Sequence, residues 1–523
     1  MKKTLFYTSI LICILFSACS DSFLTVDHTT ELEGEKAYTP ERIESAMIAA
    51  YQPLQWMDMW MPLPFISEVM GNDIRVGGGN LSDQAGIHDL SRYQAKAVNH
   101  PDAVWNSAYS GIFRTNIVLN EVDKVNISED AKETLRAEAY SLRTFYYFLV
   151  WRFYGNIPYF SNNPTDIVTE WTNIKQYSVN DAYAALINDI DTALKSGKLA
   201  KSSAEGQYGR FTQAAAQMLK AQLVLTQKDE TKYEEVLNDM QTIIASPNYA
   251  LMSNFADIWE DAGEWCSESI FEINYTDQNA TRGWGSSAFN PGGSVFQSMI
   301  GINGLSDINF NGGWGFMPME PNLYNAFEDA DTRKNASILN FKYYKEHVNP
   351  AAVYDTTRWD DTGCFNKKYL PRKGGNSHAT SSPEVNYRNN IRVFRLADTY
   401  LIAAELLVRR GQNQALADEY LNEVRGRAYK YTGSYQKTAT LDNILAERRL
   451  EFAGEGYRFF DMIRFGKESE ITHKMQTGWS DSGNGKKVRI YGTFTYDPSK
   501  RYFPIPQSEV DRSLGALKQN TGY

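Results

Sequence analysis

The chain has 523 residues, a formal net charge of −10 and a pI of about 5.3. Aromatic residues make up 13% and charged residues 22%, so the chain is too aromatic and too sparsely charged to be disordered. An acidic chain lacks the basic surface that binds a phosphate backbone, which argues against nucleic acid as a partner. Six His are few for a His-rich metal enzyme. These numbers leave an acidic globular protein with an excess of Tyr and Trp.

Residues 1–18 have the pattern of a secretory signal peptide. Two Lys precede a mostly apolar run from Leu5 to Phe16, which is shorter than the roughly 20 residues that a membrane span needs. The motif FSAC, which ends in Cys19, then resembles a bacterial lipobox. We expect Cys19 to become the new N-terminus and to carry acyl chains such as palmitate, which anchor a protein without spanning the membrane. An ordinary signal peptide with a chance Cys is the alternative.

The remaining cysteines say little about chemistry. After Cys13 and Cys19 are set aside, Cys266 and Cys364 are left, and their separation in sequence gives no geometry for a disulfide. Their spacing is also wrong for a zinc cluster. We therefore predict no metal site and no cofactor.

Helical periodicity marks several segments in the first half of the chain. Residues 128–154 carry apolar side chains in steps of three and four, with Ser128 as N-cap and Gly155 as the stop. A second helix is expected over 179–195, and residues 212–245 have the pattern of a helix pair.

Residues 396–429 repeat the helix-pair pattern of 212–245, and each unit is 34 residues long, the tetratricopeptide period. The tetratricopeptide consensus is not well matched, and the two units are not contiguous. Dispersed helix pairs in one compact body therefore fit better than an open solenoid.

A further helical stretch is expected over residues 441–465, where acids and bases alternate. Glu447 and Glu451 are one turn apart, with Arg448 and Arg449 between them. We interpret this pattern as a helix tied into the body by ion pairs. A catalytic pair of acids is the alternative, although nothing nearby supplies a nucleophile or a metal.

The region from 246 to 395 differs from the rest. Nine of the 33 residues from 283 to 315 are Gly, and the same stretch contains Trp284 and Trp314. Long irregular loops in a compact protein are either disordered or functional, and Gly-rich disorder seldom carries so many large aromatics. The sequence therefore predicts ordered, functional loops.

Several motifs, taken in order, resemble the SusD/RagB family of outer-membrane nutrient-binding lipoproteins of Bacteroidetes. The resemblance covers essentially the whole mature chain. It is carried by the lipobox and by AEAYSLRTFYYFLVWRFYGNIPYF (137–160), GRFTQAAAQMLKAQLVL (209–225), VFRLADTYLIAAELLVRRG (393–411), LNEVRGRA (421–428), ERRLEFAGEGYRFFDMIRFG (447–466) and the C-terminal YFPIPQSEV…QNTGY (502–523).

The resemblance implies a mainly α-helical protein, with about four tetratricopeptide-like helix pairs in one compact body and a large loop-rich ligand-binding insert. It divides the chain into a signal peptide (1–18), an N-terminal helical region (19–245) and a C-terminal region (246–523) with binding loops at 246–395. It also implies a lipid-anchored place on the surface of the outer membrane and a SusC-like TonB-dependent β-barrel transporter as partner. The ligand is expected to be a glycan, and no catalysis is expected.

Sugars present C–H faces that pack on aromatic rings and hydroxyls that need polar partners. Two loop regions combine such side chains, one from Gly71 to Tyr93 and the other being the Gly-rich stretch, although no family residue maps position by position onto these loops. Local packing is the alternative for Trp284 and Trp314. From chemistry alone, the predicted ligand-binding residues are Asn72, Asp73, Arg75, Asn80, Trp284, Asn311, Trp314 and Trp359.

Two alternatives stay within this architecture: a peptide-binding member of the same family, and a lipid-anchored glycoside hydrolase. A hydrolase needs two carboxyl groups about 5–10 Å apart across a cleft, and the many Asp and Glu do not exclude that. A solute-binding protein of an inner-membrane transporter is a third possibility, but those proteins are usually two α/β lobes, a pattern absent here.

Overall fold

The structure is a computed structural model that describes residues 39–60, 62–164, 171–205, 207–483 and 486–523. The predicted signal peptide (1–18) and the predicted lipidation site Cys19 lie outside these residues. Within them, no helix combines the length and the apolar character that crossing a membrane requires.

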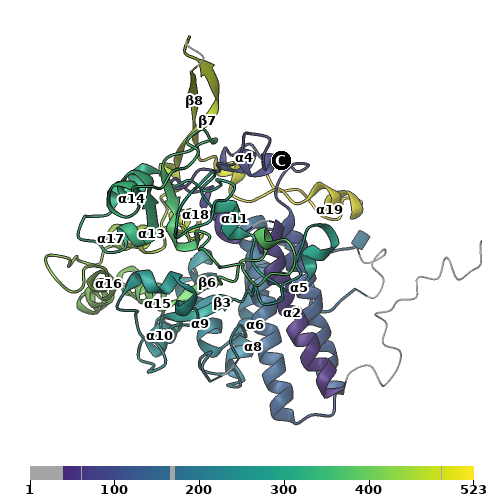
Figure 1. Cartoon of the computed structure of the whole chain (residues 1–523). Helices are drawn as coiled ribbons and strands as arrows, with labels where there is room; N and C mark the ends of the chain where they lie inside the picture. The colour runs from purple at the N-terminus through teal and green to yellow at the C-terminus, as the bar shows by residue number, and fades with distance from the viewer. Residues whose placement is uncertain (1–38, 61, 165–170, 206, 484–485) are drawn as a thin grey trace, which may run out of the picture.

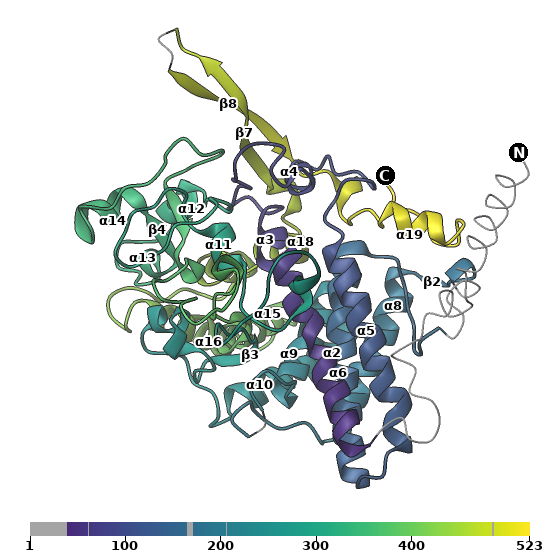
Figure 2. The same cartoon turned by 45° about the vertical axis from the view of Figure 1, so that its right-hand side comes forward.

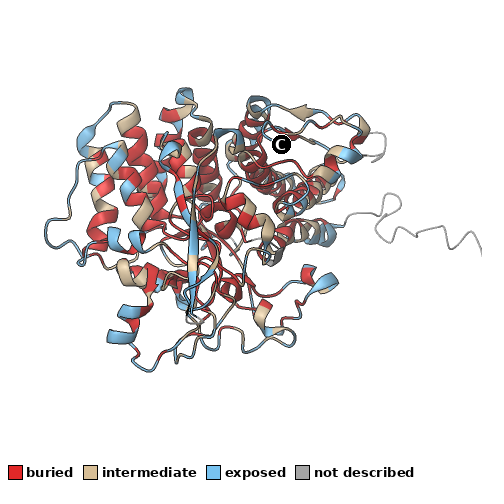
Figure 3. Cartoon of the chain, turned by 90° about the horizontal axis from the view of Figure 1, so that it is seen from above, coloured by how far each residue is buried: buried red, intermediate tan, exposed pale blue. Residues whose placement is uncertain are grey.

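The protein is mainly helical, and its long helices form a stack in which each packs on the next (Figure 1). Buried residues line the inner faces of these helices, and exposed residues line their outer faces (Figure 3). In order, the stack contains α2 (Pro40–Trp60), α5 (Ala103–Glu121), α6 (Glu129–Tyr154), α8 (Val179–Lys195), α9 (Gln213–Gln227), α10 (Tyr233–Ile244), α15 (Leu396–Arg409) and α16 (Gln414–Ala428).

Side-chain caps fix where the predicted helices begin. The hydroxyl of Ser128 accepts a hydrogen bond from the N–H of Ala131, and Thr212 does the same for Ala215, both at 3.2 Å. Helix α6 ends at Gly155, whose φ of 70° favours glycine. The predicted helices at 128–154 and 179–195 and the helix pairs at 212–245 and 396–429 are confirmed. Their tetratricopeptide-like character remains an interpretation.

The prediction of one helical stretch over 441–465 is wrong in one respect. The chain forms α17 (Leu441–Glu451) and α18 (Arg458–Arg464), with a turn between them. Gly454 and Gly456 adopt φ values of 78° and 96° in this turn, which side-chain-bearing residues rarely adopt. A Cβ at Gly454 would also lie 2.4 Å from the amide nitrogen of Asn366.

Between α10 and α15 the chain consists of loops with short elements, as the composition of this region predicts. The strands pair in two antiparallel ribbons, β3 with β6 and β4 with β5. The elements are η4 (Phe255–Trp259), η5 (Asp261–Gly263), β3 (Ser269–Ile273), η6 (Gly285–Phe289), α11 (Phe296–Ile300), α12 (Pro321–Ala326), α13 (Lys334–Ser337), β4 (Ile338–Asn340), α14 (Phe341–His347), β5 (Cys364–Asn366), η7 (Lys367–Tyr369), η8 (Pro383–Val385) and β6 (Ile391–Arg395).

A long antiparallel hairpin, β7 (Thr472–Asp481) with β8 (Lys487–Thr495), projects from the body beside α4 (Figure 2). The remaining short elements are α3 (Leu63–Glu68), α4 (Ala85–Ser91), η2 (Val122–Lys124), β1 (Ile157–Pro158), β2 (Gln176–Tyr177), η3 (Glu230–Lys232), η9 (Glu468–Glu470), η10 (Pro498–Lys500) and α19 (Gln507–Arg512).

One connected core of buried apolar residues extends from Ile43 on α2 to Ile505 near the C-terminus. The helical stack and the loop-rich region therefore share a hydrophobic interior. The predicted boundary between residues 245 and 246 stays a prediction.

A buried cluster of ion pairs surrounds Glu451 at the end of α17. Its carboxylate lies 2.6 Å from Arg427, 2.9 Å from Arg333 and 3.0 Å from Arg395. Burial would raise the pKa of Glu451, but the three guanidinium groups outweigh burial and hold the pKa below its ordinary range. The acid–base pattern predicted to tie this helix into the body therefore does so, and Glu447 also pairs with Arg333, at 2.6 Å.

We expect Glu451→Gln to destabilise the protein by about 3–5 kcal/mol, because it leaves buried guanidinium groups without their counter-charge. The midpoint of urea-induced unfolding measures this. Glu470→Gln is the matched control, since Glu470 is 61% exposed and pairs with Lys467 at 3.5 Å, so about 0–1 kcal/mol is expected. Equal midpoints for the two variants would contradict the role assigned to the cluster.

Candidate functional site

The two loop regions singled out in the sequence lie side by side. Residues 74–78 run antiparallel to residues 315–319, with isolated bridges at Ile74–Met319 and Gly77–Phe316. The N–H of Gly78 donates to the carbonyl of Gly315 at 3.0 Å. A Cβ at Gly77, where φ is 77°, would lie 2.3 Å from that same carbonyl oxygen. Only glycine therefore permits this close approach of the two backbones.

Trp284 and Trp314 come together at the surface, and we call them the Trp pair. Their ring centroids are 6.0 Å apart and their planes are tilted by 32°. Trp284 is 49% exposed, whereas Trp314 is half-buried. The two rings form an aromatic surface wider than either indole alone.

Polar groups hold the Trp pair in place. The indole N–H of Trp284 donates to Glu384 at 3.1 Å, across the loops. The N–H of Trp314 donates to the carbonyl of Ser298 at 2.8 Å, and Arg358 donates to the Trp314 carbonyl at 2.8 Å. The first bond orients the ring of Trp284 and the other two hold the backbone of Trp314 before any ligand arrives, which lowers the entropic cost of binding.

Asn80 lies on the loop that passes the Trp pair, and it is exposed. Its side-chain oxygen accepts hydrogen bonds from the N–H and the hydroxyl of Ser82, at 2.8 and 2.6 Å. The preceding Gly79 donates its N–H to Asp83 at 2.7 Å. The loop is therefore ordered by its own side chains.

Asn72 and Asp73 lie deeper than the Trp pair. The carboxylate of Asp73 is buried and forms ion pairs with Arg449 and Arg458. The side-chain oxygen of Asn72 accepts a hydrogen bond from Arg458 at 3.2 Å. Both predicted ligand contacts thus bind protein side chains, and their role in ligand binding stays a prediction.

Arg75, Trp359 and Asn311, the other predicted ligand-binding residues, are buried or half-buried in the protein. Arg75 is 9% exposed and pairs with Glu320 at 2.6 Å. Trp359 is buried, and its indole N–H has no partner in the described part of the chain. Asn311 is half-buried and donates to the Tyr387 hydroxyl at 3.0 Å. The structure therefore brings Trp284 and Trp314 together and leaves Asn80 exposed, whereas Asp73, Arg75 and Trp359 are buried.

Asp360 links this support to the β7–β8 hairpin. Its carboxylate accepts from the N–H of Gln476 at 2.6 Å, and its own N–H donates back to the Gln476 side chain at 2.9 Å. Burial raises the pKa of Asp360 to about 6, although the Gln476 hydrogen bond and the Arg75 and Arg92 guanidinium groups oppose the rise.

The sequence does not reveal the contacts of Arg358, Glu384 and Phe289. Arg358 and Glu384 are each distant in sequence from the Trp residue that they hold, and no motif marks them. Phe289 is 45% exposed and packs edge-to-face on Trp56, with ring centroids 4.8 Å apart. Only its position in the Gly-rich stretch, five residues after Trp284, marks Phe289 in the sequence as a candidate for the site.

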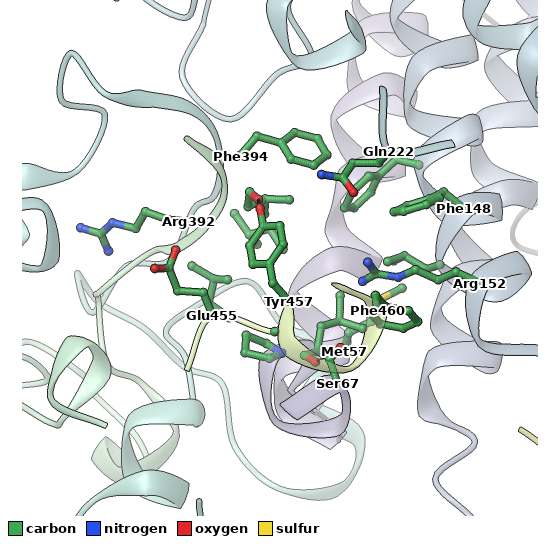
Figure 4. Close-up of a pocket in the computed structure, with 18 of the residues that line it drawn as sticks. Met57, Ser67, Phe148, Arg152, Gln222, Arg392, Phe394, Glu455, Tyr457 and Phe460 are labelled. Atoms are coloured by element: carbon green, nitrogen blue, oxygen red, sulfur yellow. Dashed lines mark hydrogen bonds between the residues drawn. The ribbon is translucent and has the colours of Figure 1, made fainter. Parts of the chain in front are cut away.

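A small cavity inside the body is not a second candidate for a large ligand. It lies between the helical stack and the α17–α18 turn, and Tyr457, Phe460 and Arg152 line it (Figure 4). Its volume of about 70 Å³ is well below the roughly 300–1,000 Å³ of typical ligand pockets. A few water molecules fill such a space.

The described residues contain no group of three or more His, Cys, Asp or Glu side chains placed to hold a metal ion. Cys266 and Cys364 are both free thiols. What the face offers is an exposed aromatic surface with amide and carboxylate groups nearby. Such a surface packs on the C–H face of a ring and hydrogen-bonds its hydroxyl groups.

Two family models match the chain. The model described as "SusD family" matches residues 267–523, and the model described as "Starch-binding associating with outer membrane" matches residues 22–225. Among curated relatives, the "SusD-like protein P25" of Formosa agariphila is 26% identical over 476 residues, covering 85% of this chain and 83% of the relative.

Solved structures are also similar. "Surface glycan-binding protein A from Bacteroides thetaiotaomicron in complex with laminarihexaose" is 35% identical with a TM-score of 0.81, and the match covers 92% of this chain and 100% of that protein. A "Laminarin binding SusD-like protein" is 29% identical with a TM-score of 0.79, covering 93% and 100%. These matches extend over both the helical stack and the loop-rich region.

We expect Gly77→Ala to separate the two loops and to lower the unfolding midpoint. Gly374→Ala is the matched control, because Gly374 has the same φ of 77° but open space where a Cβ would be. Both variants carry the cost of a left-handed residue, about 1–2 kcal/mol. The clash should cost Gly77→Ala about 1–3 kcal/mol more. Equal losses in the two variants would contradict the close packing of the loops.

Proposed function

The chain belongs to the SusD family, and from this membership we propose that it is a non-catalytic glycan-binding lipoprotein of the outer membrane. The Trp pair carries the proposal. One exposed and one half-buried indole ring, with amide and carboxylate groups nearby, are suited to the flat C–H faces and the hydroxyls of a sugar chain.

For the ligand, we propose an oligosaccharide of the laminarin type. Two similar solved structures support this choice: one was determined in complex with laminarihexaose, and the other is named as laminarin-binding. The likeness to both extends over more than nine-tenths of this chain. A peptide ligand and a glycoside hydrolase activity remain the alternatives that an experiment must separate.

We expect Trp284→Ala and Trp314→Ala each to weaken laminarihexaose binding by about 1–3 kcal/mol, or roughly 5- to 150-fold, because each removes part of the aromatic surface. Isothermal titration calorimetry measures this. Tyr431→Ala, at an exposed aromatic residue between α16 and α17, should leave the affinity unchanged.

Unchanged affinity in both Trp variants would overturn the site. Failure of the wild-type protein to bind any glycan would overturn the function and would favour a peptide. The same incubations report on catalysis, since newly released reducing ends would contradict a binding-only protein.

We further propose that Cys19 carries the lipid anchor and that the protein delivers its ligand to a SusC-like TonB-dependent β-barrel transporter at the cell surface. The family resemblance and the lipobox motif support this, and one matching family model is described as associating with the outer membrane. The acyl chains would hold the protein at the membrane without a spanning segment.

Cell fractionation tests the anchor, and co-purification tests the partner. We expect Cys19→Ala to move the protein from the membrane fraction to the soluble fraction, because acyl chains can no longer be attached. The unaltered protein, extracted from outer membranes with detergent, should bring a large β-barrel protein with it. A membrane-bound Cys19→Ala variant, or recovery of the wild type alone, would contradict the corresponding proposal.

A further inference from the structure

A groove of about 760 Å³ is lined at one edge by Phe289, five residues after Trp284, and no part of the proposed function assigns it a role. This volume is within the roughly 300–1,000 Å³ of typical ligand pockets. The groove runs between the end of η6 and the first residues of α4 and α5. We call it the amide groove, and it is lined by Trp56, Ser82, Gln84, Ala85, Gly86, Ile87, Asn99, His100, Pro101, Asp102, Ala103, Asn106, Ser107 and Phe289.

The amide groove has polar walls with unused hydrogen-bonding capacity. Gln84, Asp102 and Asn106 are exposed, and within the described ranges their side chains form no hydrogen bond or ion pair. Amide groups both donate and accept hydrogen bonds, and a carboxylate accepts them, which matches the hydroxyls of a sugar. The lining includes no Lys or Arg, so the groove favours a neutral ligand over an anionic one.

An aromatic edge completes the groove and is held rigidly. Phe289 packs edge-to-face on Trp56, and its carbonyl accepts hydrogen bonds from the side chains of Trp56 and Gln52, both at 3.3 Å. Nearby, Arg282 donates to the carbonyl of Gln55 on α2 at 3.1 Å. These contacts fix η6 against α2.

Two segments lead from the Trp pair to the amide groove. Trp284 directly precedes η6, and Phe289 ends it, so the two residues are about 10 Å apart at the rise of a 3₁₀ helix. The second segment begins at Gly78, which forms a backbone hydrogen bond with Gly315, the residue after Trp314. The same loop continues to Gln84, which lines the groove. Each segment therefore runs from a residue at or next to the Trp pair to a residue that lines the groove.

We propose that the amide groove is a second subsite of the glycan-binding site, which holds the continuation of a neutral sugar chain whose first rings pack on the Trp pair. The inference rests on the proposed function. Every neutral oligosaccharide would contact the Trp pair, and only chains long enough to extend past η6 would also occupy the groove. Affinity should therefore rise with chain length in the wild-type protein.

Calorimetry with laminaribiose and laminarihexaose tests the second subsite. We expect the double variant Gln84→Ala/Asn106→Ala, and separately Phe289→Ala, to weaken laminarihexaose binding about ten-fold and to leave laminaribiose binding unchanged. Trp284→Ala should weaken both. The matched control is Gln412→Ala/Asn188→Ala, a pair of exposed residues at the α15–α16 turn and on α8, which should change neither.

The outcomes separate the inference from the function on which it rests. If Trp284→Ala loses affinity while both groove variants bind laminarihexaose as the wild type does, the second subsite is wrong and the proposed function stands. Equal wild-type affinities for the two oligosaccharides would also overturn the subsite. If the wild type binds neither, the proposed function itself fails. Thermal melting of each variant confirms that a loss of affinity is not a loss of fold.

Discussion

The buried ion pairs around Glu451 are the constraint on which the rest of the structure depends. Arg333 precedes α13, Arg395 ends β6 and Arg427 lies on α16, so one carboxylate joins the loop-rich region to the helical stack. Arg395 also pairs with Glu268, next to β3, at 2.5 Å. Charges removed from water must be paired, so these elements have little freedom to move apart. The paired strands β3 and β6 in turn bracket the loops that carry the Trp pair.

Rigidity at the binding face has a different physical origin. There, backbone groups take part in the contacts: Gly77 lets its loop approach the carbonyl of Gly315 closely. The carbonyl groups of Trp314 and Phe289 accept hydrogen bonds from Arg358 and Gln52. Loops held in this way present aromatic rings at a fixed tilt, so little ordering entropy is lost when a ligand binds. The candidate binding residues thus lie on loops, and the rigid scaffold beneath them holds these loops in position.

Charged residues near glycine turns do not reveal from sequence alone whether they face solvent. Asp73 and Arg75 stand in a loop rich in glycine, but each is buried against a residue of opposite charge from a distant segment. Trp359 is also buried, whereas a large apolar ring that remains exposed is a candidate for a ligand contact. Trp284 is such a residue, and Phe289 becomes one once its position over the groove is known.

The sequence by itself determined the helices, the acid–base helical stretch predicted over 441–465, the ordered loops between 246 and 395 and the family, because periodicity, caps and ordered motifs are local properties. It could not determine that α17 stops before Gly454, that Asp73 is paired, or that Trp284 and Trp314 touch. Those facts depend on contacts between residues far apart in the chain, such as Gly77 with Gly315. Only the tertiary structure decides them, because a side chain's partner across the fold is set by packing and not by sequence neighbours.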